Sequence, residues 1–149
     1  MTIIRLVILF LLVIALQPCM AQETTIYNSP LPYEDTCAKL EELLQIKGFI
    51  NDEFKTVEYD KDTSELNIRV TTFEFSDPYI MDGIVACEPT AAIDMPFRIA
   101  VWSEEADVYI GFVDPIWLKR RYLLRGCDEI LSEYSKTLIR IVNETIRRD

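Results

Sequence analysis

Two closely spaced segments rich in β-branched and aromatic residues, 97–102 and 108–113, dominate the secondary-structure pattern of this sequence. Such residues favour extended chain because they fill a pleated, half-buried surface. A short acidic stretch, residues 103–107, separates the two segments. A connection this short joins antiparallel neighbours, so the sequence predicts a central β-hairpin.

Three other segments have the pattern of helices. Over residues 33–47 the apolar residues keep helical spacing, and this places Cys37 on the core face. Asp114-Pro115 predicts a helix over residues 116–124 that ends near Gly126, because Asp caps free N–H groups and Pro suits the first helical position. The last helix is expected over 128–147, with acidic residues at its start and basic residues at its end, as the helix dipole favours.

The remaining chain completes an α+β pattern. Residues 54–59 and 66–75 predict a second hairpin, 83–87 a short strand, and 89–93 a single helical turn. The polar residues 22–32 are interpreted as a leader arm, so that one domain occupies 33–149. We expect an antiparallel sheet covered by helices, in two layers.

The first 21 residues have the order of a secretory signal peptide. A short segment with one basic residue precedes an apolar run over 6–16, Gln17-Pro18 breaks it, and Cys19-Met20-Ala21 supplies small residues at both recognition positions. We expect cleavage before Gln22 and a periplasmic or secreted protein, with membrane contact only through this segment before cleavage. The alternatives are an uncleaved anchor and a lipoprotein modified at Cys19.

The charge of the chain limits its partners. The sequence carries 25 acidic and 15 basic residues, a net charge of −10, and loses one basic residue with the signal. Nucleic acids and anionic membrane surfaces attract basic patches, so neither is expected as a partner.

The cysteines admit two interpretations. Cys37, Cys87 and Cys127 remain after cleavage, an odd number in an oxidising compartment. The first interpretation is one structural disulfide with a buried thiol, or three buried thiols, and any two of the three can pair. The second is a reactive thiol used in redox or sulfur-carrier chemistry, for which Cys87 is the candidate because it lies between periodic elements.

Histidine is absent from the sequence. Catalytic triads, His-ligated metals and the usual general base near neutral pH are therefore excluded. The sequence also lacks dinucleotide-binding, phosphate-loop and nucleophile-elbow motifs, so no cofactor and no metal site is expected. Catalysis by carboxylates alone stays an alternative, but a non-enzymatic protein is favoured.

Five short motifs together resemble the DUF302 family. They are Ile93-Asp94-Met95-Pro96 before a strand, a Val-Trp-acidic turn at 101–105, a second aromatic strand at 108–113, Asp114-Pro115 at a helix start, and Lys47-Gly48-Phe49 after the first helix. The resemblance implies a compact α+β domain, dimeric in many members, with no established biochemical activity.

Two groups of side chains are candidates for binding. Lys119, Arg121 and Arg125 form a basic cluster that suits an anionic ligand or acidic partner; the alternative is pairing with the domain's own carboxylates. Trp102, Tyr109 and Trp117, with Phe112, suit an apolar pocket with Arg121 at its mouth; the alternative is that they are core.

The function that the sequence favours is therefore an exported, non-enzymatic domain that binds a small molecule or a protein. The homodimer is one form of this hypothesis, through an exposed sheet or the closing helices. A thiol-dependent redox or sulfur-carrier protein is the alternative, and it requires a free cysteine near Arg121 or Arg125.

Overall fold

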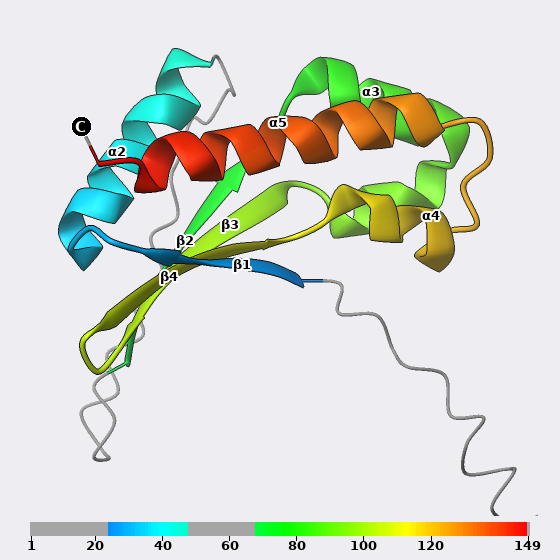
Figure 1. The fold of residues 1–149 in the computed structure, drawn as a ribbon. Coiled ribbons are helices and arrows are strands. Elements are labelled where there is room, and N and C mark those ends of the chain that lie inside the picture. Colours follow the sequence, from blue (N-terminus) through cyan, green and yellow to red (C-terminus); the bar gives the residue numbers. More distant parts are fainter. Residues whose placement is uncertain (1–23, 48–67, 149) are drawn as a thin grey trace, which may run out of the picture.

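The predicted central hairpin lies in an antiparallel sheet with the strand order β1-β4-β3-β2 (Figure 1). The computed structural model describes residues 24–47 and 68–148. Strands β3 (Phe97–Glu104) and β4 (Asp107–Val113) pair with Trp102 opposite Tyr109. β2 (Ile68–Phe75) pairs with β3, which confirms the strand predicted to end at Phe75. The strand predicted over 54–59 and the signal segment lie outside the described residues.

β1 (Thr24–Ser29) corrects the prediction of a leader arm over 22–32. It pairs antiparallel with β4, from Thr24 opposite Val113 to Ser29 opposite Val108. The β-branched and aromatic residues of Thr-Thr-Ile-Tyr favour a strand. Pairing with β1 also gives hydrogen-bond partners to backbone N–H and C=O groups of β4 that would be unpaired if β4 were the edge strand. The folded unit therefore begins before Tyr33.

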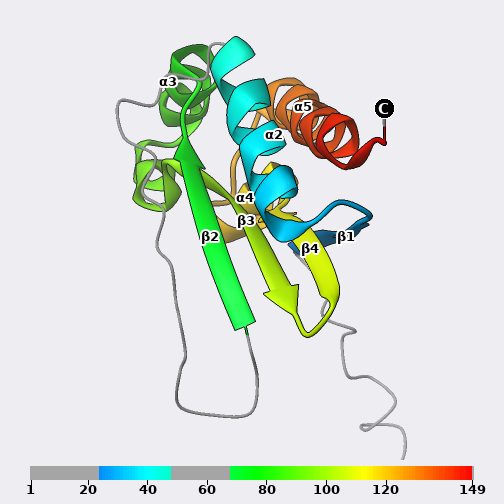
Figure 2. The ribbon, with the colours of Figure 1, turned by 90° about the vertical axis from the view of Figure 1, so that its left-hand side faces the viewer.

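Two long helices cover one face of the sheet (Figures 1 and 2). α2 (Tyr33–Ile46) and α5 (Asp128–Ile146) match their predicted extents within one residue at each end. They contact each other, and α5 also contacts α3. The predicted antiparallel sheet covered by helices is confirmed.

α3 (Pro78–Cys87) corrects the short strand predicted over 83–87. The Asp77 carboxylate accepts hydrogen bonds from the backbone N–H of Tyr79 at 2.9 Å and of Ile80 at 3.2 Å, and Pro78 occupies the first turn. The Asp77 cap and Pro78 together start a helix, and this helix continues through the apolar residues 83–87, for which the sequence alone predicts a strand. The 3-10 helix η1 (Pro89–Asp94) confirms the helical turn predicted at 89–93.

The helix predicted over 116–124 is shorter in the structure. It consists of the 3-10 helix η2 (Pro115–Trp117) and α4 (Leu118–Arg121). Asp114 caps it as predicted, accepting from the Ile116 N–H at 3.0 Å. Leu123 has a positive φ of 52°, a conformation that ends a helix and costs a β-carbon residue free energy. The reversal returns Leu124 to the core, where it is buried.

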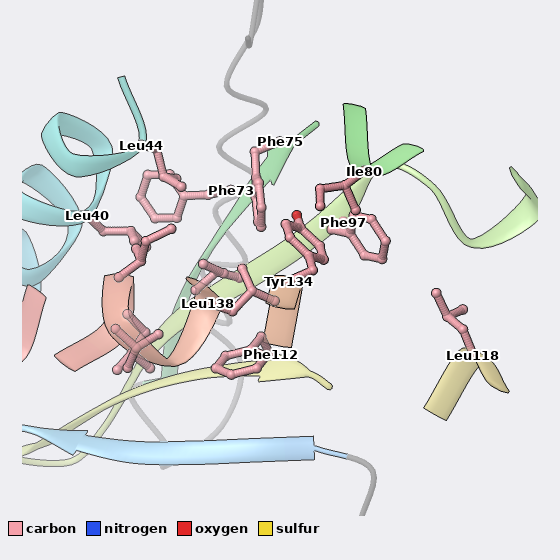
Figure 3. Packing of buried hydrophobic residues seen from close by; sticks show 14 of the residues in the cluster. Leu40, Leu44, Phe73, Phe75, Ile80, Phe97, Phe112, Leu118, Tyr134 and Leu138 are labelled. Atoms are coloured by element: carbon pink, nitrogen blue, oxygen red, sulfur yellow. The ribbon is translucent and has the colours of Figure 1, made fainter. Parts of the chain in front are cut away.

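The core lies between the sheet and the helices (Figure 3). Tyr134 of α5 packs its ring between Phe75 and Phe97, with centroid distances of 6.3 and 4.7 Å. On β3 the alternate residues Phe97, Ile99 and Val101 are buried in this core. Residues of opposite parity on each strand therefore point to the other face of the sheet. No helix within the described ranges is long and apolar enough to cross a membrane.

Candidate functional site

The second face of the sheet carries apolar side chains, and no described helix covers it (Figure 1). We name it the open face. Its apolar residues lie at the parity opposite to the core on all four strands, namely Ile26, Ile68, Val70, Ala100, Trp102, Tyr109 and Val113. Ile26 and Val113 are 45% and 43% exposed. A solvent-facing sheet surface is normally polar, so this apolar patch is the candidate functional surface.

A stacked aromatic pair occupies the centre of the open face. Trp102 and Tyr109 are cross-strand neighbours with centroids 5.4 Å apart and ring planes inclined by 20°. The indole of Trp102 also lies over Gly111, where an added β-carbon would be 3.2 Å from the ring. Both rings are half-buried by these contacts. The pair is thus held in place and presents a firm apolar surface.

Trp117 lines a separate small pocket at one end of the open face. The pocket has a volume of about 170 Å³ and is lined by Asp94, Pro96, Phe97, Arg98, Val113, Trp117 and Leu118. Trp102 and Tyr109 are not among these residues, so this pocket does not bring the three predicted side chains together. Phe112, the fourth aromatic of the predicted set, is buried in the core. Pockets for drug-sized ligands are typically about 300–1,000 Å³, so this one suits a single side chain.

A polar cluster borders the Trp117 pocket. The Asp94 carboxylate accepts a hydrogen bond from the Tyr122 hydroxyl at 2.8 Å and pairs with Arg121 at 3.2 Å. The Arg121 guanidinium also lies 4.9 Å from the centre of the Trp117 ring. Desolvation and the hydrogen bond to Asp94 raise the pKa of Tyr122, so its hydroxyl stays a donor at neutral pH. Asp94 is held as a structural acceptor between two donors.

The predicted basic cluster does not form one site. Lys119 pairs with Asp128 and Arg121 with Asp94, which supports the alternative of pairing with the domain's own carboxylates. Arg125 is exposed, and the described part of the chain shows no ion pair for it. An anion would therefore have to compete with internal carboxylates for two of the three cations.

The cysteines favour the structural interpretation. Cys87 at the end of α3 forms a disulfide with Cys127 at the start of α5, with Cα atoms 6.4 Å apart, so Cys87 has no free thiol in this structure. Cys37, on α2, is the free cysteine of the described residues. Burial raises the pKa of its thiol to about 11, and neighbouring Thr71 and Tyr33 lower it only in part. At neutral pH this thiol is protonated and a poor nucleophile.

The described residues contain no group of three Cys, Asp or Glu side chains suited to hold a metal ion. The candidate site is a surface made of a stacked aromatic pair, its apolar neighbours and a small pocket at one end. The signal for the open face was present in the sequence. Apolar residues at both parities of 97–102 and 108–113 indicate a strand with two apolar faces.

The fold and this surface define a small α+β domain whose antiparallel sheet is covered on one face and open on the other. The family model "Domain of unknown function DUF302" matches residues 25–145, and the chain belongs to this family. The match includes β1 and confirms the resemblance seen in the sequence motifs.

A solved structure has the same fold. The crystal structure of an uncharacterised conserved DUF302 protein from Bacillus stearothermophilus aligns with a TM-score of 0.71 and 16% sequence identity. The alignment covers 85% of this chain and all of that one. No curated protein shows a match to this chain.

Proposed function

We propose that this protein is an exported, non-enzymatic protein-binding domain that assembles with a second copy of itself through the open face. The observation that carries the proposal is the apolar, aromatic surface on the helix-free side of the sheet. Two such faces can pack against each other as the two layers of a sandwich do, about 10 Å apart.

The order of residues along β3 supports a second copy as the occupant. On the open face this strand presents Arg98, Ala100, Trp102 and Glu104. A twofold axis that reverses the strand direction places Arg98, which also pairs with Glu74 of its own chain, near Glu104 of the other copy, and Trp102 opposite Ala100. The interface would then contain two contacts between opposite charges and two contacts of a large residue with a small one. Each contact occurs twice because an isologous interface uses the same surface on both copies.

β4 has the same complementarity. Val101 and Ile110 are cross-strand partners, so the same axis places Tyr109 of one copy opposite Gly111 of the other, where it meets the Trp102 indole that lies over that glycine. The Trp117 pocket lies at the end of the face, next to Arg98 and Val113, where a side chain of the second copy can enter. Central aromatic anchors with charged residues at the rim are typical of protein interfaces.

Export rests on the amino-terminal sequence and gains support from the disulfide. The first 21 residues have the order of a cleavable signal, and disulfides persist in oxidising compartments. The Cys87–Cys127 bond suits such a compartment. The described residues do not favour the thiol-dependent alternative. Cys127, two residues after Arg125, is bonded to Cys87, and the thiol of Cys37 is protonated at neutral pH.

The test is a charge placed at the centre of the open face. In Ala100→Glu, the new carboxylate would be buried against the other copy, and desolvation would disfavour assembly. We expect sedimentation velocity to show a dimer for the purified wild-type protein and a dimer dissociation constant at least about 100-fold larger for the variant.

Ala38→Glu is the matched control, because Ala38 is exposed on α2, on the opposite side of the sheet. It makes the same chemical change and should leave the dimer intact. A wild-type protein that stays monomeric at about 100 μM, a concentration that detects even weak association, would overturn the proposal. So would equal weakening by the two variants.

A further inference from the structure

The ion pairs of this chain leave several cations together on one helix. Within the described residues, carboxylates pair with Lys47, Arg69, Arg98, Lys119 and Arg121. In contrast, Lys136, Arg140 and Arg147 have no carboxylate partner in the described part of the chain, and all three are exposed. Lys136 and Arg140 lie on α5, and Arg147 is its C-cap, where the helix dipole favours a basic residue.

Lys136 and Arg140 form a stripe along α5, and Arg147 extends it just past the helix end at Ile146. With Asn143, the two helical cations recur at intervals of three or four residues, so they lie on one side of the helix. From Lys136 to Ile146 the helix extends roughly 15 Å, at about 1.5 Å per residue. The stripe faces away from the sheet, because the buried residues of α5, such as Leu138 and Val142, lie on its opposite side.

The stripe lines a shallow groove. The groove has a volume of about 370 Å³ and is bordered by Lys136, Ile139, Arg140, Asn143, Glu144 and Arg147. Its one carboxylate, on Glu144, is paired with Lys47 at 3.2 Å. Lys39 donates a hydrogen bond to the carbonyl oxygen of Arg147 at 2.7 Å and fixes the end of the helix. The groove thus combines positive charge with an apolar floor at Ile139.

The charges of the stripe repel each other when no anionic partner is bound. Lys136 and Arg140 are like-charged neighbours one turn apart, a spacing that destabilises a helix slightly. The groove is lined mainly by α5, which covers the face of the sheet opposite to the open face (Figure 1), so both surfaces can be occupied together.

We infer that this α5 groove binds an acidic polypeptide segment of a partner protein. Carboxylates spaced along the segment pair with Lys136, Arg140 and Arg147, and an apolar side chain of the segment contacts Ile139. The inference does not depend on the dimer, because it concerns another side of the molecule.

The experiment uses a fluorescein-labelled peptide of about twelve alternating Glu and Leu residues, long enough to follow the stripe. Fluorescence anisotropy is measured at about 0.15 M salt, where charges beyond about 8 Å are screened but direct pairs persist. We expect Lys136→Glu with Arg140→Glu to weaken binding at least about tenfold. The control is Arg120→Glu, measured beside the single variant Arg140→Glu; it makes the same change of net charge at an exposed site outside the groove and should change binding less than about twofold.

Equal weakening by Arg120→Glu and Arg140→Glu, or equal binding of a Gln–Leu peptide, would overturn the inference. Binding of the wild-type protein to anionic phosphatidylglycerol vesicles but not to the peptide would also overturn it. Circular dichroism checks that the variants are folded. If the reversed variant is not, Lys136→Gln with Arg140→Gln is measured instead, and an unchanged affinity for the peptide there contradicts the inference.

Discussion

The hydroxyl of Tyr134 is an unsatisfied polar group in the core. The residue is 1% exposed, and its hydroxyl oxygen has no hydrogen-bond partner among the described residues. Burial, with a smaller effect from Asp77, raises the pKa of Tyr134 far above its usual value. The hydroxyl is therefore always protonated, and its burial costs free energy that no hydrogen bond offsets.

Replacing Tyr134 by Phe should preserve or increase stability. The ring contacts with Phe75 and Phe97 remain, while the unpaired hydroxyl is removed (Figure 3). We expect the free energy of unfolding, measured by urea titration, to be unchanged or higher by about 1 kcal/mol. Leu138→Ala in the same core should instead lower it by about 2–5 kcal/mol. A loss above about 1 kcal/mol in Tyr134→Phe would show that the hydroxyl has a bound partner such as a water molecule.

At the scale of elements, the disulfide joins the end of α3 to the start of α5. It links cysteines separated by 40 positions in the sequence. Closing a loop of this length restricts the unfolded chain and should stabilise the domain by about 3–4 kcal/mol. The double substitution Cys87→Ser and Cys127→Ser is expected to lower the free energy of unfolding by that amount.

Reductant supplies the check on this prediction. The wild-type protein should lose about the same 3–4 kcal/mol when reduced, and the double variant should not respond. Cys37→Ser, which leaves the bond intact, should stay sensitive to reductant. An unfolding midpoint of the wild-type protein that reductant does not move would contradict the prediction.

The elements that the sequence predicts well are those with a strong period or a capping signal. The spacing of Tyr33, Leu40 and Leu44 identifies α2, and the hairpin of β3 and β4 follows from its aromatic and β-branched residues. α3 was missed because a short apolar run does not distinguish helix from strand. β1 was missed because its definition as a strand depends on pairing with β4, which is distant in sequence.

The candidate site was predicted only in part, for the same reason. Sequence reasoning selected Trp102, Tyr109 and Trp117 but grouped them in one pocket. The pairing register of β3 and β4 places Trp102 beside Tyr109. Trp117 follows β4 in the 3-10 helix η2 and lines a different pocket. Which carboxylate pairs with Lys119 or Arg121, and which cysteines bond, depends on contacts between elements that periodicity does not determine.

At the scale of the whole molecule, net charge opposes the proposed assembly. After the signal and its one basic residue are removed, each copy carries 14 basic and 25 acidic residues, a net charge of −11, so two copies repel each other at a distance. Apolar residues occupy the middle of the open face, beside Asn28 and Thr72, and the charged residues lie at its ends. Burial of apolar surface is favourable without any pairing of charges. Dimerisation then depends on apolar contacts that overcome a long-range repulsion.

Salt should therefore tighten the dimer. The screening length falls from about 30 Å at 0.01 M to about 8 Å at 0.15 M, so added salt removes most of the repulsion between the two copies. We expect the dimer dissociation constant, measured by sedimentation equilibrium, to fall roughly three- to tenfold over this range. Salt also screens the expected contacts of Arg98 with Glu104 of the other copy, but only two such contacts oppose the repulsion of the whole chains. A dimer that weakens as salt is added would mean that ion pairs dominate the interface, and the apolar open face would not be the surface that holds it together.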